Sequence, residues 1–93
     1  MDNDEVELDE RLAAIRDDLV EKGVPESDIW RANKKVSDRM NVRRAGQTFE
    51  IVRGGDLFYV YRIGSDGLRQ LPPEIFEAAN PAFPDSMYEM IGV

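Results

Sequence analysis

The N-terminal part of the chain repeats apolar residues with the period of an α-helix. Four apolar side chains recur at intervals of three or four residues, namely Leu8, Leu12, Ile15 and Leu19. This spacing places them on one face of a helix. We expect a helix over residues 5–22 that ends at Gly23, because glycine favours the position that follows a helix C-terminus.

Residues 25–40 show the same period. The apolar stripe of this segment consists of Ile29, Ala32, Val36 and Met40. Pro25 suits the first turn of a helix, and the acids Glu26 and Asp28 suit the positive end of its dipole. The connection to the first helix is short, so the sequence predicts an antiparallel α-hairpin.

Residues 47–71 change to an alternation of apolar and polar positions that is typical of β-strands. Strands are expected at 48–53, at 57–63 and, more briefly, at 68–71. Gly54-Gly55 and the run Gly64–Gly67 supply the two turns between them. The sequence therefore predicts a three-stranded antiparallel β-meander.

A two-residue loop at Gly54-Gly55 would fix the register of the first two strands and set Ile51 opposite Phe58. One face of the meander then carries Phe49, Ile51, Phe58 and Val60. This face is the obvious one to receive the α-hairpin, although strand 57–63 is apolar enough on both faces to leave the choice open. The other face is mixed and carries Thr48, Glu50, Val52, Leu57, Tyr59, Tyr61 and Gln70.

The C-terminal residues 73–91 are expected to form short helical segments. One follows Pro72-Pro73 over residues 74–79, and another starts near Pro84 and carries Met87, Tyr88, Met90 and Ile91. Residues 1–4 form an acidic lead-in that should be frayed. The predicted fold is a single α+β domain, with the N-terminal α-hairpin packed on the β-meander.

Composition limits the chemistry more than it limits the fold. The 93 residues suit one domain and include neither cysteine nor histidine. This excludes thiol catalysis, disulfides and imidazole or thiolate metal sites. The segment Asp2–Glu5 resembles the start of a calcium loop, but Val6 follows where a ligand is needed. We therefore expect a non-catalytic protein without a cofactor or metal.

Charge is divided along the chain. The net charge of −7 combines −8 over residues 1–28, +5 over residues 29–53 and −4 over residues 54–93. The acidic first block repels nucleic acid and anionic membranes, whereas the basic block attracts them. One interpretation is that the two blocks neutralise each other within the fold, and the other is that each serves a partner.

The leading hypothesis is an acidic protein-interaction module, an adaptor or inhibitor that docks on a larger protein partner. Its contacts would be an acidic helix edge (Glu10, Asp17, Glu21) and the sheet-face residues Tyr59 and Tyr61. An acidic chain of this size could occupy a nucleic-acid-binding surface by charge mimicry. A phage or mobile-element origin fits such an inhibitor. Without a signal sequence or an apolar span, we expect a cytoplasmic protein that does not enter a membrane.

The alternative hypothesis is a small nucleic-acid-binding regulator. Its contacts would come from the basic segment, namely Arg31, Lys34, Lys35, Arg39, Arg43 and Arg44. A helix-turn-helix arrangement is disfavoured, because the acids Glu26 and Asp28 would begin the recognition helix. Nucleic acid is therefore the less favoured partner. Self-association through Tyr59 and Tyr61 or through a sheet edge is a third alternative.

Overall fold

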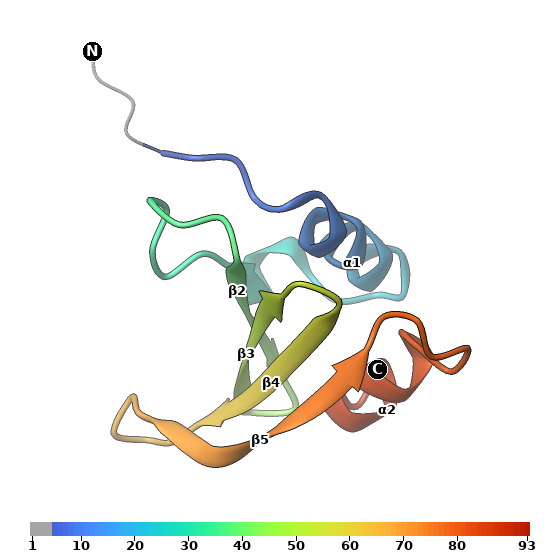
Figure 1. Ribbon diagram of the computed structural model, residues 1–93. Coiled ribbons are helices and arrows are strands. Elements are labelled where there is room, and N and C mark those ends of the chain that lie inside the picture. Colours follow the sequence, from blue (N-terminus) through green and yellow to red (C-terminus); the bar gives the residue numbers. More distant parts are fainter. Residues whose placement is uncertain (1–4) are drawn as a thin grey trace.

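A computed structural model describes residues 5–93, which form one antiparallel β-sheet with two α-helices packed on it (Figure 1). Each strand pairs with its neighbours in the chain, in the order β1-β2-β3-β4-β5. The elements in sequence are α1 (Glu10–Glu21), a 3-10 turn (Glu26–Asp28), β1 (Ile29–Trp30), β2 (Arg39–Arg44), β3 (Gln47–Gly54), β4 (Leu57–Ile63), β5 (Arg69–Glu77) and α2 (Asp85–Ile91). The α+β class is confirmed, and the expectation for residues 1–4 lies outside the described residues.

Both helices cover the same face of the sheet (Figure 1). Their buried side chains meet those of β2, β3 and β4 in one core, which consists of Leu12, Ile15, Leu19, Val24, Met40, Val42, Phe49, Ile51, Phe58, Val60, Met87, Tyr88 and Ile91. The favoured face of the predicted meander is therefore the covered one. Among residues 5–93, no helix lies on the opposite face, which carries Tyr59 and Tyr61.

The first helix is shorter at its N-terminus than predicted. It begins after Asp9, whose carboxylate accepts hydrogen bonds from the backbone N–H groups of Arg11 (2.8 Å) and Leu12 (3.3 Å). The preceding residues are extended instead, since the Val6 N–H donates to the Lys34 carbonyl and the Asp9 N–H to the Ser37 carbonyl. Residues 5–9, predicted as the first turn of the helix, are therefore an extended segment that hydrogen-bonds to the loop before β2, and the helix starts at a capped position after them.

The C-terminus of α1 follows the prediction. Gly23 has φ +104°, and its N–H donates to the carbonyl of Val20 at 3.0 Å. The N–H of the buried Val24 donates to the carbonyl of Leu19 at 3.0 Å. This pair of bonds is the Schellman arrangement, which satisfies the last carbonyls of a helix.

The prediction of a second helix over residues 25–40 is wrong, and no α-hairpin forms. Only the 3-10 turn Glu26–Asp28 is helical in this segment, which continues as β1, a loop and β2. Of the predicted apolar stripe, Ala32 is exposed and Met40 is buried. Met40 is followed at a spacing of two by the buried Val42, so this part of the segment has the period of a strand.

Two hairpin loops determine the sheet register. The loop between β2 and β3 consists of Ala45 and Gly46, both with positive φ, at 54° and 77°, as type I′ turns require. The loop between β3 and β4 is Gly55-Asp56 rather than Gly54-Gly55, because Gly54 pairs with Leu57. The register is therefore two residues from the predicted one. A shift of two leaves every side chain on its predicted face.

The sheet extends further at its C-terminal end than predicted. The expected short strand 68–71 is the start of β5, which runs through Pro72-Pro73 to Glu77, so the predicted helix at 74–79 is wrong. Phe76 lies opposite Phe58 and Ile75 opposite Tyr59. Gln70 pairs with Arg62 and so lies on the Phe49 side rather than on the Tyr61 side. The final helix is confirmed as α2, which ends at Gly92 with φ +95°.

Candidate protein-interaction groove

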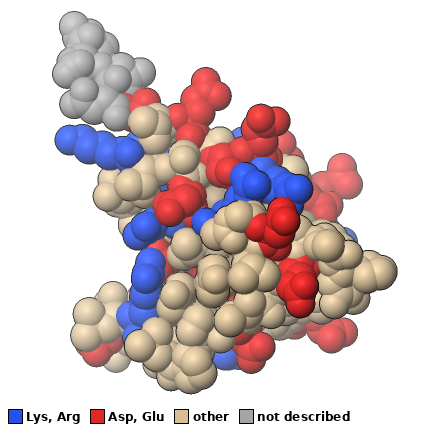
Figure 2. Space-filling view, viewed as in Figure 1, with Lys and Arg blue, Asp and Glu red and all other residues tan. Residues whose placement is uncertain are grey.

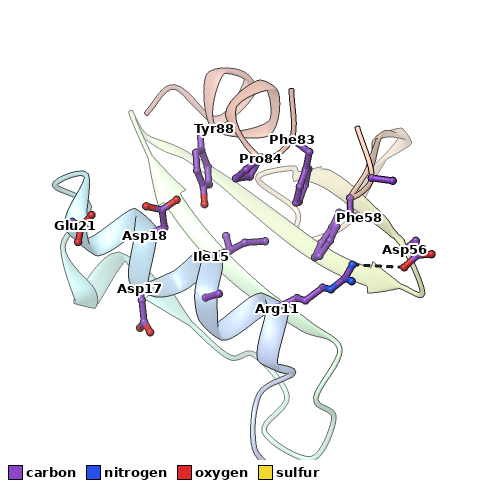
Figure 3. Close-up of a pocket in the computed structure, with 13 residues that line it drawn as sticks. Arg11, Ile15, Asp17, Asp18, Glu21, Asp56, Phe58, Phe83, Pro84 and Tyr88 are labelled. Atoms are coloured by element: carbon purple, nitrogen blue, oxygen red, sulfur yellow. Dashed lines mark ion pairs between the residues drawn. The ribbon is translucent and has the colours of Figure 1, made fainter. Parts of the chain in front are cut away.

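A groove of about 710 Å³ lies between α1 and the segment that leads into α2 (Figure 3). One wall is the face of α1 that points toward α2, and the other is the chain after β5. Its lining consists of Arg11, Ala14, Ile15, Asp17, Asp18, Glu21, Asp56, Phe58, Ala78, Ala79, Phe83, Pro84 and Tyr88. A volume of this size suits a small ligand or a short peptide segment.

Small side chains on the two walls leave this space open. Ala14 on α1 and Ala79 after β5 are both exposed, and Phe83 is half-buried. Below them, the buried Phe58 ring stacks on Phe83 with 5.0 Å between ring centroids and an interplanar angle of 21°. The groove therefore has an apolar base that is continuous with the core.

Carboxylates gather at one end of the groove, where α1 ends. Asp17, Asp18 and Glu21 lie in the last part of the helix, and no residue of its last turn is basic. Acids are unfavourable there because the C-terminal end of a helix dipole is negative. Asp17 and Glu21 are also one turn apart, which adds like-charge repulsion. The stability of the helix itself therefore does not account for this concentration of negative charge.

Two local cations offset this charge in part. Arg16 lies 3.4 Å from Asp17, but both side chains are largely exposed, so the pair contributes little. Lys22, the residue that caps α1, places its ammonium 5.3 Å from the centre of the Tyr88 ring. This end of the groove therefore lies beside the side-chain ammonium of Lys22.

Tyr88 links the two walls across the groove. Its hydroxyl points at Asp18 (Figure 3), and burial together with this hydrogen bond raises the pKa of Tyr88 well above its usual value. The buried hydroxyl donates, and the Asp18 carboxylate accepts. The contact joins α1 to α2 beside the groove, in addition to the core that both helices share.

We expect Tyr88→Phe to lower the free energy of unfolding by about 1 kcal/mol, the typical net value of one hydrogen bond. Because folding raises the pKa of Tyr88, its contribution is complete below the unfolded pKa of about 10 and is lost as the pH rises through the folded pKa. An alkaline absorbance titration should lose its most alkaline tyrosine step in this variant. Tyr61→Phe, which leaves Tyr88 and Asp18 intact, should retain that step. If the most alkaline step persisted in Tyr88→Phe, its assignment to Tyr88 would be wrong.

The other end of the groove is closed by an ion pair. Arg11 in the first turn of α1 lies 3.6 Å from Asp56 in the loop between β3 and β4 (Figure 3). Both side chains are well exposed, so the pair is weak and can rearrange. The two ends of the groove therefore differ, because three carboxylates line the end near Glu21 and a guanidinium paired with one carboxylate lies at the other.

The structure separates the predicted acidic edge. Asp17 and Glu21 line the groove, whereas Glu10, in the first turn of α1, does not. Asp17 and Glu21 also border a second hollow of about 630 Å³ beside Glu26 and Ile29, so they form a ridge between two depressions. The sequence did not indicate that Asp56 and Phe83 lie beside α1, because the loops that carry them reach this helix only through the fold.

The open face of the sheet unites Tyr59 and Tyr61 with residues from other strands. The guanidinium of Arg69 lies 4.4 Å from the Tyr61 ring centre and donates to Glu50 at 2.6 Å. Glu50 is only 8% exposed, so its carboxylate is largely sheltered from solvent, whereas the side chain of Arg69 is 39% exposed. Much of the surface in Figure 2 that lies over β4 and β5 is uncharged.

The basic segment does not form one surface. Arg31 donates to the carbonyls of Val6 and Val36 and serves the fold. Arg39 pairs with Asp38, which holds the Asp38 pKa below its usual value. Lys34 and Lys35 lie on the loop before β2, while Arg43 stacks over Trp30 with 5.7 Å to the ring centre and Arg44 ends β2. The predicted helix 25–40, which would have carried Arg31, Lys34 and Lys35 on one face with the three arginines extending the charge past its end, does not form.

Sheet edges offer little for self-association. The outer edge strand β5 contains Pro72 and Pro73, which donate no backbone hydrogen bonds, and β1 at the other edge has two residues. Leu71 and Ile75 on β5 are nevertheless 75% and 55% exposed. Edge pairing between copies is therefore obstructed, and a contact between copies at β5 would have to be made by these side chains.

The remaining observations concern membranes, metals and known proteins. The longest helix among residues 5–93 has 12 residues, fewer than the ~20 that a membrane span requires. In the same part of the chain, no group of three acidic side chains converges closely enough to hold a metal ion. We compared the chain with protein-family models, with curated proteins and with solved structures, and none of the three comparisons found a match.

Proposed function

We propose that this chain is a non-catalytic protein-interaction module, an adaptor or inhibitor that binds a basic surface of a larger protein through the groove between α1 and α2. The observation that carries this proposal is the groove itself, with its apolar base and its concentration of carboxylates. If these acids served only to keep the helix face solvated, no open apolar groove would be expected beside them. We expect the interaction to take place in the cytoplasm.

Charge supports a basic partner over an acidic one. The groove lining holds four carboxylates (Asp17, Asp18, Glu21, Asp56) against the single guanidinium of Arg11. Such a surface accelerates the approach of a basic protein and repels acidic ones. A partner that binds nucleic acid has a surface of this sign, so inhibition by charge mimicry is the form of activity we favour.

The alternative proposal, a nucleic-acid-binding regulator, has less support. Of the six basic residues that it requires, Arg31 is engaged by backbone carbonyls and Arg39 by Asp38. The aromatic residues Tyr59 and Tyr61 do share an open face with Arg43 and Arg69, which is the observation in its favour. The experiment below distinguishes the two.

The test is an affinity capture from lysate that has been divided into nuclease-treated and untreated halves. The baits are the wild type, the groove variant Asp17→Asn/Glu21→Gln, and a matched variant, Glu7→Gln/Glu10→Gln, whose acids lie outside the groove. We expect a basic protein that wild type and matched variant retain in both halves and that the groove variant loses. Equal retention by all three baits, or loss on nuclease treatment, would overturn the proposal.

A further inference from the structure

The face of α1 that lines the groove carries an ordered series of side chains. Arg11, Ala14, Asp18 and Glu21 follow one another at three- or four-residue intervals and so form one stripe along the helix. The stripe is about 15 Å long, because a helix rises about 1.5 Å per residue. Its order is guanidinium, small apolar residue, carboxylate, carboxylate. A ligand that matches it must have an order too.

From this order we infer that the groove binds a protein segment in which an apolar anchor precedes or follows a basic residue at a fixed spacing. The anchor is a side chain the size of leucine or phenylalanine, seated between Ala14 and Phe83. The basic residue is lysine or arginine, placed beside Asp18 and Glu21. This inference rests on the proposed function and specifies what the groove of that module accepts.

The anchor follows from the walls of the groove. Ala14 and Ala79 are exposed, and Phe83 is half-buried above the fully buried Phe58. A charged or purely polar ligand would leave this apolar surface in contact with water. Burying one leucine or phenylalanine there contributes about 1.5–3 kcal/mol, which corresponds to an affinity gain of about ten- to a hundredfold.

The basic residue follows from the carboxylate end. Asp18 already accepts the hydroxyl of Tyr88, and the ammonium of Lys22 lies over the same ring. The acids are spread along the helix and hold no metal-type cluster among residues 5–93. A line of charge of this kind suits an organic cation on a flexible side chain.

The distance between the two positions sets the spacing in the ligand. Asp18 and Glu21 lie one to two helical turns beyond Ala14, or about 6–10 Å along the axis. A helical ligand would therefore carry its anchor and its basic residue about four to seven positions apart. A general acidic surface would impose no such spacing.

The test uses three fluorescein-labelled peptides of about twelve residues, which matches the length of the stripe. All three carry the same two arginines, and each is also made with its sequence reversed, because the anchor is allowed on either side of the basic residue. The first has phenylalanine four residues before them, the second has alanine in its place, and the third has phenylalanine directly next to the arginines. Fluorescence anisotropy at near-physiological salt measures the affinities. We expect the first peptide to bind at least about tenfold more tightly than the other two.

Two variants assign the binding to the groove. Ala14→Trp fills the space between the walls, and Ala32→Trp makes the same change at an exposed loop position outside the groove lining. We expect Ala14→Trp to weaken binding of the first peptide by about tenfold or more, and Ala32→Trp to leave it unchanged. The groove variant Asp17→Asn/Glu21→Gln provides a second measurement if Ala14→Trp does not fold.

The outcomes separate this inference from the proposed function. Equal affinity for all three peptides would overturn the anchor and its spacing while leaving a basic partner in place. If none of the peptides binds but the lysate capture yields a partner that depends on the groove, the anchor and its spacing are likewise overturned, and the proposed function stands. Sedimentation that shows dimers which Ala14→Trp abolishes would overturn the inference as well, because a second copy of the chain would be the occupant. Failure of the lysate capture alone would contradict only the proposed function.

Discussion

Phe58→Ala is expected to lower the free energy of unfolding by about 3–5 kcal/mol, the range for removing a large aromatic side chain from a packed core. Phe58 is 0% exposed. It lies on β4 opposite Phe76 of β5 and stacks on Phe83, so its ring joins the sheet to the segment that leads into α2.

Urea unfolding monitored by circular dichroism would measure this effect. The matched control is Tyr59→Ala, because Tyr59 is the next residue on β4 and points to the face that no helix covers. Its loss should be clearly smaller, since truncating a half-exposed ring removes less buried surface. Similar losses for the two variants would show that the covered face is not the core of the protein.

A stable protein needs more than about 5 kcal/mol to tolerate this change, and small domains have about 5–15 kcal/mol in total. If Phe58→Ala leaves the chain unfolded, Phe58→Leu offers a milder substitution. Its cost should be smaller because leucine refills most of the space. The order of stability, wild type above Phe58→Leu above Phe58→Ala, is then the expected result.

The central hairpin could be predicted from sequence because its signals are local. Alternating residues in 48–53 and 57–63, separated by glycines, specify two strands and their inner face. The loop position was off by one residue at each end, which changed the register but not the face. α2 was similarly evident, since its apolar residues and its terminal Gly92 lie within a few positions of each other.

The segments that were predicted wrongly owe their structure to distant partners. The segment predicted as a helix over residues 25–40 instead ends in the start of β2, which lies between β1 and β3, where Met40 and Val42 reach the core. β5 continues past Pro72-Pro73 because β4 offers it an edge and because proline is tolerated on an outer strand. Neither pairing is visible in the local pattern, because tertiary contacts override local propensity here.

The candidate groove also combines a part that local sequence predicts with a part that depends on distant contacts. Its acidic wall could be predicted, because Asp17 and Glu21 are close together on one helix. The opposite wall, with Ala79 and Phe83, lies about sixty residues further along the chain. Only the sheet between them brings the two walls together. The sequence therefore predicted an acidic surface, but the groove beside it is evident only from the three-dimensional structure.

Asp9→Ala is expected to lower the free energy of unfolding at neutral pH by about 2–4 kcal/mol, from two losses. The first is the N-cap of α1, worth about 1 kcal/mol. The second is the ion pair with Arg53 of β3, whose side chain is 27% exposed and that of Asp9 19%. Removing one partner leaves the other charge poorly solvated, which costs more than the pair itself contributes.

The pH dependence follows from the Asp9 pKa. Burial raises it, but the Arg53 guanidinium and the backbone N–H groups of Arg11 and Leu12 together outweigh burial and hold it below its usual value. The unfolded chain then binds a proton more readily than the folded one. The stabilisation is therefore complete above the unfolded pKa of about 3.9 and is lost as the pH falls through the folded pKa.

Asp9→Asn separates the two losses. Asparagine is an equally good N-cap but carries no charge, so this variant should keep the helix start and lose the ion pair and its pH dependence. Urea unfolding at about pH 7 and again at about pH 3 should show the gap between wild type and Asp9→Asn narrowing at the lower pH. Because Asp38 is present in both proteins, its own lowered pKa cancels in the comparison. A gap that is independent of pH would show that Arg53 holds Asp9 by geometry and not by charge.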